Sequence, residues 1–293
     1  MTGFFNVYKE SGYTSHDVVA IVRKLTGVKT GHTGTLDPQA EGVLPICLGR
    51  ATKLADMITG QGKSYVAEVV LGVFTDTGDM TGEVINTAAV CFNKETICKV
   101  VARFCGQQLQ TPPMYSAIKI GGKKLYELAR KGQTVERKPR LINIESIQVL
   151  ELRPEKNSFV IDVKCSKGTY IRSLCMDIGA ALGTVATMGL LIRTSSGDFS
   201  VDSAAKIHEI REAAAAGRLY NMLLPVEKVL PFPKGYVKPD GLLMAKNGNP
   251  LPICLVDMPH PTSNKIWLHG QSGLIGLYSY DPTLAKLRLE VML

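Results

Sequence analysis

The segment that decides how this chain is interpreted is Gly31-His-Thr-Gly-Thr-Leu-Asp-Pro-Gln-Ala-Glu-Gly-Val-Leu-Pro-Ile-Cys-Leu-Gly49. Its glycines let the backbone approach a ligand closely, and Pro38 stiffens the loop directly after Asp37. The lysine of a phosphate-binding Gly-x-x-x-x-Gly-Lys-Ser/Thr loop is missing, and one His with two acids does not make a metal site by spacing alone. Taken by itself, the segment is either a structured turn or a catalytic loop.

A second unusual segment is Cys165-Ser-Lys-Gly-Thr-Tyr-Ile-Arg-Ser173, at a predicted strand–loop–helix junction. Lys167, Tyr170 and Arg172 place two cations and an aromatic ring beside a glycine. Such a group can hold a carboxylate or a phosphate and can stack a base. The alternative is a solvated junction with a half-buried tyrosine.

Residues 119–140 form a third segment, which is strongly basic. Tyr115 and Tyr126 are interleaved with its charges, so it fits either a nucleic-acid clamp or a solvated basic helix. Its eight cations are Lys119, Lys123, Lys124, Arg130, Lys131, Arg137, Lys138 and Arg140.

The composition limits the class of protein. The 293 residues carry a formal net charge of +8. Such a charge indicates either a polyanionic partner or a role in solubility, and motifs have to decide between the two. No run of 18 apolar residues occurs, and the first ten residues lack the apolar core of a signal peptide. The seven cysteines contain no Cys-x-x-Cys pair, so we expect a reduced, cytoplasmic protein without disulfides or structural zinc. The seven-residue spacing of Cys91, Cys98 and Cys105 predicts one helix face with burial in a core.

Helix and strand patterns alternate irregularly, which predicts an α+β fold with a mixed sheet and packed helices. The composition changes around Leu230-Pro-Phe-Pro-Lys-Gly235, so we expect a first domain over residues 1–232 and a small β-rich domain over residues 236–293. The expected helices cover residues 16–26, 94–104, 171–182 and 204–218, and the expected strands cover residues 64–73, 141–152 and 158–165.

Seven segments, taken in order, resemble the TruB family of pseudouridine synthases. The resemblance runs from about Gly3 to about Pro231 and continues more weakly beyond. It implies the pseudouridine synthase fold, in which the mixed sheet is largely antiparallel, followed by a PUA-like RNA-binding domain. For the latter, Lys246-Asn-Gly-Asn-Pro250 is the recognisable signature. The seven segments are Thr14-Ser-His-Asp-Val-Val19, Gly31-His-Thr-Gly-Thr-Leu-Asp-Pro38, Lys63-Ser-Tyr-Val66, Pro113-Met-Tyr-Ser-Ala-Ile-Lys119, Gly122-Lys-Lys-Leu-Tyr-Glu-Leu-Ala-Arg130, Ser166-Lys-Gly-Thr-Tyr-Ile-Arg172 and Leu191-Ile-Arg-Thr-Ser-Ser-Gly197.

The resemblance implies isomerisation of uridine to pseudouridine at position 55, in the TΨC arm of tRNA. Asp37 takes the family's catalytic position as a nucleophile, although the sequence leaves open whether it attacks the ribose or removes a sugar proton. Tyr65 is implied to stack on the flipped uracil and Arg172 to pair with Asp37. Because a guanidinium can hold both carboxylate oxygens at once, we expect the Arg172 guanidinium within hydrogen-bond reach, about 2.7–3.2 Å, of the Asp37 carboxylate. His32 is implied to fill the space that the base leaves, and Tyr170 to take another active-site position.

The implied partner is the TΨC stem-loop of tRNA, bound partly by the RNA-gripping insertion at residues 119–140, which includes Lys119, Lys123, Lys124 and Lys131. No metal, nucleotide or redox cofactor is called for, because the isomerisation is internally balanced. We expect a monomeric, stand-alone enzyme. Two alternatives are a guide-RNA-dependent synthase, which shares this catalytic domain, and a non-catalytic tRNA-folding module.

Overall fold

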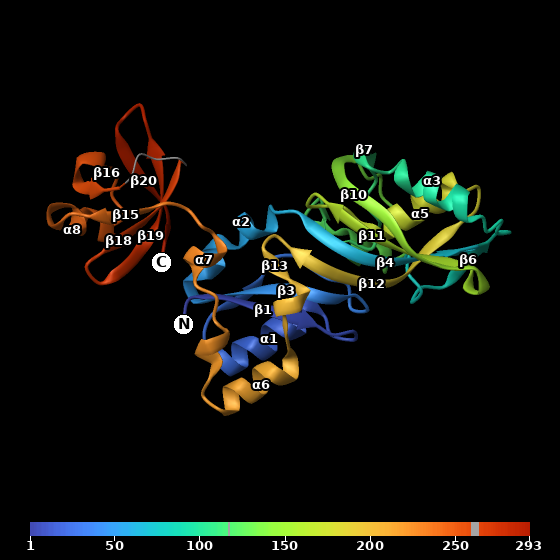
Figure 1. The fold of residues 1–293 in the computed structure, drawn as a ribbon, viewed down its shortest axis with the longest axis horizontal. Helices are drawn as coiled ribbons and strands as arrows, with labels where there is room; N and C mark the ends of the chain where they lie inside the picture. Colours follow the sequence, from blue (N-terminus) through green and yellow to red (C-terminus); the bar gives the residue numbers. More distant parts are fainter. Residues whose placement is uncertain (117, 259–263) are drawn as a thin grey trace.

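The computed structural model describes residues 1–116, 118–258 and 264–293, and two large β-sheets dominate it (Figure 1). The first sheet has ten strands. This sheet agrees with the predicted α+β class and with the predicted mixed, largely antiparallel strand arrangement. Its strands are β1 (Gly3–Lys9), β2 (Thr30–His32), β3 (Glu41–Leu48), β4 (Lys63–Leu71), β7 (Gly106–Gln110), β10 (Arg140–Arg153), β11 (Ser158–Cys165), β12 (Ala186–Ser196), β13 (Phe199–Ser200) and β14 (Ala205–Lys206).

The strand order of the first sheet is β14-β1-β3-β12-β4-β11-β10-β7. The β14–β1 and β3–β12 pairs are parallel, and the other neighbours along this path are antiparallel. Along β4, buried and half-buried residues alternate at every step, as they do in a strand with one face on the core. The order places β4 beside β12, so residues far apart in sequence meet in the middle of the sheet.

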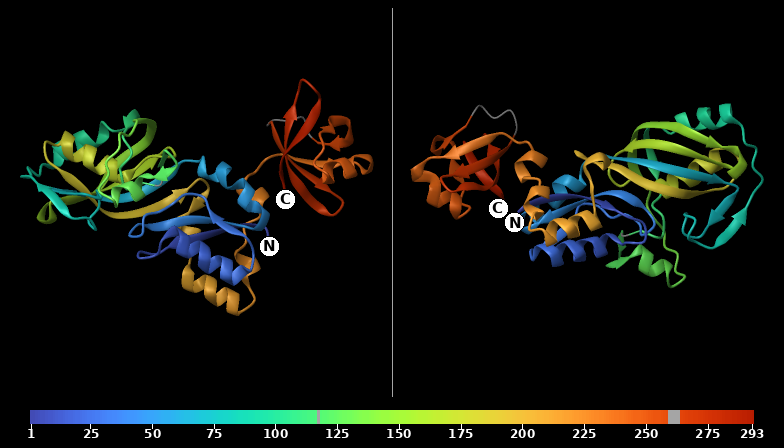
Figure 2. Two further views of the ribbon diagram at one scale, coloured as in Figure 1. Left: turned by 180° about the vertical axis from the view of Figure 1, so that it is seen from behind. Right: turned by 60° about the horizontal axis from the view of Figure 1, so that its bottom comes forward.

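Two pairs of helices cover different parts of this sheet (Figures 1 and 2). Helix α1 (Ser15–Thr26) packs with α6 (Ile207–Ala215) near β1, and α3 (Lys94–Ala102) packs with α5 (Ile171–Ala181) near β10 and β12. Helix α1 begins with a capping box between Thr14 and Asp17 and ends at Gly27, whose φ of 67° suits a residue without a side chain.

The second sheet is six-stranded, in the order β16-β20-β19-β18-β15-β17. It shares a hydrophobic core with the first sheet, because Trp267 and Leu277 pack with Phe4, Val43 and other residues of the first sheet. Figure 2 shows it at one end of the molecule, beside both termini. Its strands are β15 (Lys234–Val237), β16 (Leu251–Pro252), β17 (Val256–Asp257), β18 (Lys265–Gly270), β19 (Gly273–Asp281) and β20 (Lys286–Met292). Helix α7 (Val226–Val229) precedes this sheet and contacts β1, and helix α8 (Leu242–Lys246) lies between β15 and β16 in the chain.

Shorter elements complete the fold. Helix α2 (Ala55–Thr59) precedes β4, and β5 (Val73–Thr75) pairs with β6 (Val84–Thr87). The basic insertion forms a small hairpin of β8 (Lys119–Ile120) and β9 (Lys123–Lys124), followed by α4 (Leu125–Ala129). Residues 130–139 contain no helix or strand. The insertion is therefore not the basic helix considered as an alternative.

Three sequence-based expectations need correction. Cys91, Cys98 and Cys105 are exposed rather than buried, because only Cys98 lies within α3 and the buried face of that helix is formed by Ile97, Val100 and Val101. The helix expected over residues 204–218 is shorter, since Ala205 and Lys206 pair with β1 instead. The strand expected over residues 64–73 ends at Leu71, where the chain turns at Gly72 with φ 82°.

Candidate active site

Asp37 lies in the loop between β2 and β3, and neighbouring elements hold that loop from both sides. The Ser15 hydroxyl donates to the carbonyl of Leu36 at 3.1 Å and accepts from its amide at 2.9 Å. The amide of Gly12 donates to the carbonyl of Pro38 at 3.0 Å. Because the residues on either side of Asp37 are fixed, its carboxylate has a defined position at the sheet surface.

Lys9, at the end of β1, holds the same loop from within. Its ammonium is fully buried and donates to the carbonyls of Glu10 (3.1 Å), Tyr13 (2.7 Å) and Pro38 (2.9 Å). Burial lowers the pKa of Lys9 to about 8. With all three N–H groups bonded to backbone carbonyls, Lys9 ties the β1–α1 turn to the residue next to Asp37.

Arg172, in the first turn of α5, meets Asp37 directly. Its Nε lies 3.0 Å from Asp37 Oδ2. The two Nη atoms are engaged elsewhere: Nη1 donates to the carbonyl of Thr77 at 2.9 Å and Nη2 to that of Tyr115 at 2.7 Å. The Arg172 guanidinium thus lies within the predicted distance of the Asp37 carboxylate. It binds through Nε alone, because both Nη atoms are anchored to two loops.

The surroundings of Asp37 shift the pKa of its carboxyl group in opposite directions. Burial raises the pKa of Asp37 above its usual range, and Asp79 adds to this, while the adjacent Arg172 guanidinium lowers it. The Asp37 side chain keeps 38% of its surface open, whereas Arg172 keeps 6%. The result is an accessible carboxylate whose charge depends on a buried cation.

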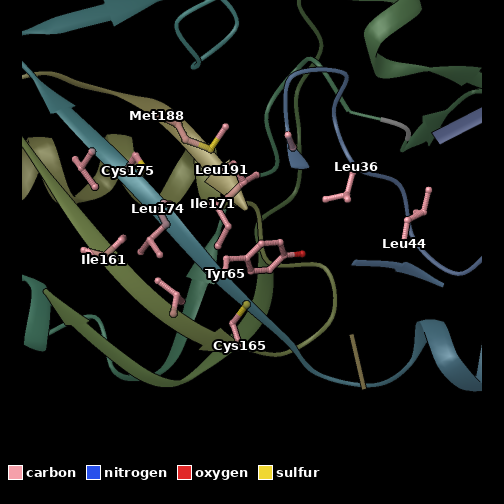
Figure 3. Packing of buried hydrophobic residues seen from close by; sticks show 14 of the residues in the cluster. Leu36, Leu44, Tyr65, Ile161, Cys165, Ile171, Leu174, Cys175, Met188 and Leu191 are labelled. Carbon is pink, nitrogen blue, oxygen red and sulfur yellow. The ribbon is translucent and has the colours of Figure 1, made fainter. Parts of the chain in front are cut away.

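Tyr65 comes from β4 and is buried in the main core (Figure 3). In Figure 3 its ring points away from Ile161 and Leu174, with the hydroxyl toward the side on which Leu36 lies. Burial raises the pKa of Tyr65, and a hydrogen bond from Arg193 opposes that rise. The phenol is therefore un-ionised at neutral pH, and Tyr65 lines the same cavity as Asp37.

Arg193, on β12, is 1% exposed and was not singled out from the sequence. Its Nε donates to the carbonyl of Val43 at 2.7 Å and its Nη2 to that of Gly34 at 3.0 Å. It therefore joins Tyr65 to the loop that contains Asp37. The only sequence signal was its place in the segment Leu191-Ile-Arg-Thr-Ser-Ser-Gly197, because a buried arginine that binds carbonyls has no recognisable partner in a sequence.

His32 and Tyr170 flank this centre. The amide of Gly34 donates to His32 Nδ1 at 3.2 Å, and burial lowers the pKa of His32, so the ring is neutral with its proton on Nε2. His16 contacts the His32 ring edge-on, with centroids 5.6 Å apart. Tyr170 precedes α5, and both its backbone amide and its carbonyl bond to the Gln110 side chain.

These side chains share one cavity of about 730 Å³, a volume that accommodates a nucleotide. Tyr115, which precedes the basic insertion, and Arg140, at its end, both border the cavity. Lys119, Lys123 and Lys131 are exposed on the insertion and do not line the cavity, and the side chain of Lys124 lies outside the described part of the structure. The cavity is lined by His32, Gly34, Thr35, Leu36, Asp37, Thr59, Lys63, Tyr65, Tyr115, Ser116, Arg140, Leu141, Ile142, Lys167, Gly168, Thr169, Tyr170, Ile171, Arg172, Leu191 and Arg193.

Comparison with known families assigns the chain. Residues 22–171 match the TruB family pseudouridylate synthase (N terminal domain), and residues 172–231 match the tRNA pseudouridylate synthase B C-terminal domain. The chain belongs to the TruB family of pseudouridine synthases. The boundary between the two matched regions falls beside Arg172, so each contributes one partner of the Asp37–Arg172 pair.

Named relatives agree with this assignment. The chain is 44% identical over 280 residues to tRNA pseudouridine synthase B of Alkaliphilus oremlandii, which covers 94% of this chain and 92% of the relative. It is 47% identical over 236 residues to tRNA pseudouridine synthase B of Bacillus subtilis, covering 78% and 76% of the two chains. This TruB-family enzyme is therefore similar to bacterial proteins over nearly its full length.

Two solved structures share the fold. One is a Cbf5-Nop10-Gar1 complex, with a TM-score of 0.74 and 27% identity, covering 99% of this chain and 83% of that one. The other is an H/ACA RNP bound to a substrate RNA containing 2'-deoxyuridine, with a TM-score of 0.73 and 25% identity, covering 99% and 84%. Both sheets of the present chain are thus represented in these neighbours, including the β-rich C-terminal part, in agreement with a PUA-like module.

Within the described residues, no three His, Cys, Asp or Glu side chains gather as a metal site would require. No helix in the described ranges is long and apolar enough to cross a bilayer. The cavity brings together a carboxylate, a buried guanidinium and an aromatic ring.

Proposed function

We propose that this enzyme isomerises uridine 55 in the TΨC arm of tRNA to pseudouridine, as a stand-alone monomer in the cytoplasm. The observation that carries the proposal is the Asp37–Arg172 pair, 3.0 Å apart in a cavity that fits one nucleotide. The names of the relatives support tRNA as the substrate, since they are called tRNA pseudouridine synthase B.

In the proposed reaction, Asp37 attacks C1′ of the ribose as a nucleophile. The bond between C1′ and N1 breaks, and its electron pair leaves with the uracil. The uracil turns, C5 forms a new bond to C1′ as the bond to Asp37 breaks, and the proton on C5 is lost while N1 gains one. No electron is gained or lost overall. Arg172 keeps the carboxylate charged until it attacks, because its guanidinium lowers the pKa of Asp37.

The other side chains of the cavity have proposed roles in holding the flipped nucleotide. Tyr65 offers a ring face on which the uracil stacks, a contact that contributes roughly 1–3 kcal/mol per base. His32 is neutral and stands at the edge of the Asp37 loop, where it can occupy the space vacated by the base. Tyr170 borders the same cavity from the start of α5.

RNA binding is proposed to extend well beyond the cavity. The exposed Lys119, Lys123 and Lys131 of the basic insertion would neutralise RNA phosphates. Lys124 is proposed to act with them, although its side chain lies outside the described part of the structure. We divide the chain into a catalytic domain, residues 1–232, and a PUA-like RNA-binding domain, residues 236–293. The support for this division is the pair of separate sheets.

The test is to incubate the purified chain with an unmodified tRNA transcript and no guide RNA. Carbodiimide labelling followed by reverse transcription reads pseudouridine at position 55. A transcript with cytidine at that position and the Asp37→Asn variant are the controls. Product only after addition of a guide RNA would indicate the guide-dependent class, and tight tRNA binding without product would indicate a folding module.

A further inference from the structure

The cavity has a cationic corner that the reaction at Asp37 does not use, formed by Lys63 and Lys167. Lys63 is buried at the start of β4, two residues before Tyr65 and on the same face of the strand. Its ammonium donates to the carbonyls of Thr59 at 3.1 Å and Gln61 at 2.9 Å. An ammonium has three N–H groups, so these two bonds orient Lys63 and leave one donor for the cavity.

Lys167 reaches the same corner from the other side. It is exposed, it lines the cavity, and its Nζ lies 4.0 Å from the point where Gly60 would carry a Cβ. The turn that presents it is held firmly, because Ser166 and Asn143 exchange two hydrogen bonds, Ser166 N to Asn143 O at 2.8 Å and Asn143 N to Ser166 Oγ at 2.9 Å. Both lysines therefore lie against the turn of residues 59–61.

The two ammonium groups lack an acidic partner. Among the described residues, neither forms an ion pair with a carboxylate. Burial lowers the pKa of Lys63 to about 8, and the positive charges of Arg193 and Lys167 add to this. Cations held together without counter-charge in a partly dry site favour an anionic ligand. An ammonium is also a common point-charge ligand for phosphate.

We propose that Lys63 and Lys167 form a phosphate subsite, which binds one of the two backbone phosphates that flank the target uridine. This inference rests on the proposed function. With the ribose over Asp37 and the uracil on Tyr65, the sugar–phosphate backbone of a flipped nucleotide has to leave through the cavity mouth. Lys167, which is exposed, and Lys63, which is buried, both line this cavity. The subsite would thus fix the backbone on one side of the nucleotide while Asp37 acts on the other.

The experiment is a double-mutant cycle in which a lysine of the enzyme and a phosphate of the RNA are neutralised singly and together. Three TΨC stem-loops each carry one neutral methylphosphonate, either 5′ of the target uridine, 3′ of it, or in the stem. Each is titrated with the wild-type enzyme, Lys167→Ala and the control Lys94→Ala, whose lysine is exposed at the start of α3 and outside the cavity. Fluorescence anisotropy gives the Kd, and single-turnover kinetics give the rate.

Lys167→Ala should weaken binding of the all-phosphate stem-loop roughly tenfold, as expected for loss of one charge-assisted contact. That penalty should vanish when one of the two flanking phosphates is neutral and persist when the stem phosphate is neutral. Lys94→Ala should bind every RNA as the wild type does. The 5′ and 3′ RNAs decide which phosphate is bound.

An equal Lys167→Ala penalty on all three modified RNAs, or no penalty at all, would overturn the subsite. For Lys63, which also caps the carbonyl end of α2, Lys63→Met should show the same coupling and Lys63→Arg should restore it. A helix-capping role alone would make the Lys63→Met defect independent of the RNA phosphate. If Lys63→Met does not fold, the Lys167 cycle decides. Because Kd reports binding and not product formation, an inactive wild-type enzyme would refute the proposed function and not the subsite.

Discussion

Replacing Arg172 with lysine tests whether the geometry of the cation, rather than its charge, sustains the chemistry. The guanidinium makes three charged hydrogen bonds in three directions, to Asp37, to Thr77 and to Tyr115. A lysine ammonium is a point charge on a flexible stem and cannot reproduce that fork. It can approach Asp37 only by giving up at least one of the two carbonyls that fix its place.

The magnitude follows from those contacts. A hydrogen bond to a charged group contributes about 1.5–3 kcal/mol, and each 1.36 kcal/mol corresponds to a factor of ten in rate. If Arg172→Lys loses one such contact in the transition state, the rate of pseudouridine formation should fall by roughly 10 to 100 times. Arg172→Met leaves Asp37 without any cation, so a loss of about a thousandfold or more is expected.

The pH dependence of the rate gives a second readout. Asp37 must be ionised to act, so activity is present above its pKa and is lost as the pH falls through it. Burial already raises the pKa of Asp37, and Arg172 lowers it. The acid limb of the rate profile should therefore lie above the usual range of an aspartate in the wild type, and higher still in Arg172→Met.

Single-turnover pseudouridine formation at saturating RNA, measured across pH, is the appropriate assay. Arg153→Lys is the matched control. Arg153 is the last residue of β10, and it forms partly exposed ion pairs with Glu68 of β4 and Glu151 of β10. That control should change neither rate nor profile. A rate within about threefold of the wild type for Arg172→Lys, or an unmoved acid limb in Arg172→Met, would refute the reasoning.

Four further predictions concern other parts of the molecule. Asp37→Asn should abolish product while tRNA affinity stays within about threefold in a filter-binding assay, because phosphate contacts supply most of the affinity; measurable turnover would reject the nucleophile. Tyr65→Phe should keep RNA affinity whereas Tyr65→Leu should lose about 1–3 kcal/mol of binding free energy, and equal losses would point to the hydroxyl. Replacing Lys123 and Lys131 together with alanine should reduce the slope of log affinity against log salt by about 1 to 2, and an unchanged slope would mean that they are only solvated. Trp267→Ala should lower the free energy of unfolding by about 3–5 kcal/mol in urea titrations, since Trp267 is fully buried and donates to the carbonyl of Leu230; a loss below about 1 kcal/mol would show that the shared core is dispensable.

The elements with clear local signals could be predicted from the sequence. Thr14 and Gly27 delimit α1 because a side-chain cap and a left-handed residue are local requirements, and Asn93 likewise caps α3 through the amide of Thr96. The prediction that Cys91, Cys98 and Cys105 are buried on one helix face was wrong, because that pattern does not by itself show where a helix ends. A seven-residue spacing marks a helix face only if the helix continues, and α3 contains Cys98 alone.

The catalytic motifs could be recognised as a set, but their mutual geometry could not. The contact between Arg172 and Asp37 was expected from the chemistry of a guanidinium, and it forms at 3.0 Å. What the sequence did not show is that the carbonyls of Thr77 and Tyr115 accept from both Nη atoms, so that only Nε binds the carboxylate. Backbone carbonyls exist at every residue, so no sequence pattern shows which of them a side chain will bind.

The same limitation explains why Lys9, Lys63 and Arg193 were not singled out, and it points to how the site is built. All three cations are buried, and all three donate to backbone carbonyls around the cavity. Burying a cation without a carboxylate costs several kcal/mol, which the carbonyl dipoles offset only in part. A carboxylate beside any of these three cations would neutralise the cation and remove that cost. It would also place a second carboxylate near Asp37, which would raise the pKa of Asp37 further. Binding the loops through carbonyls avoids that conflict. Within the described residues, Arg172 is then the cation that forms an ion pair with Asp37, and Lys63 keeps one donor for an anionic substrate.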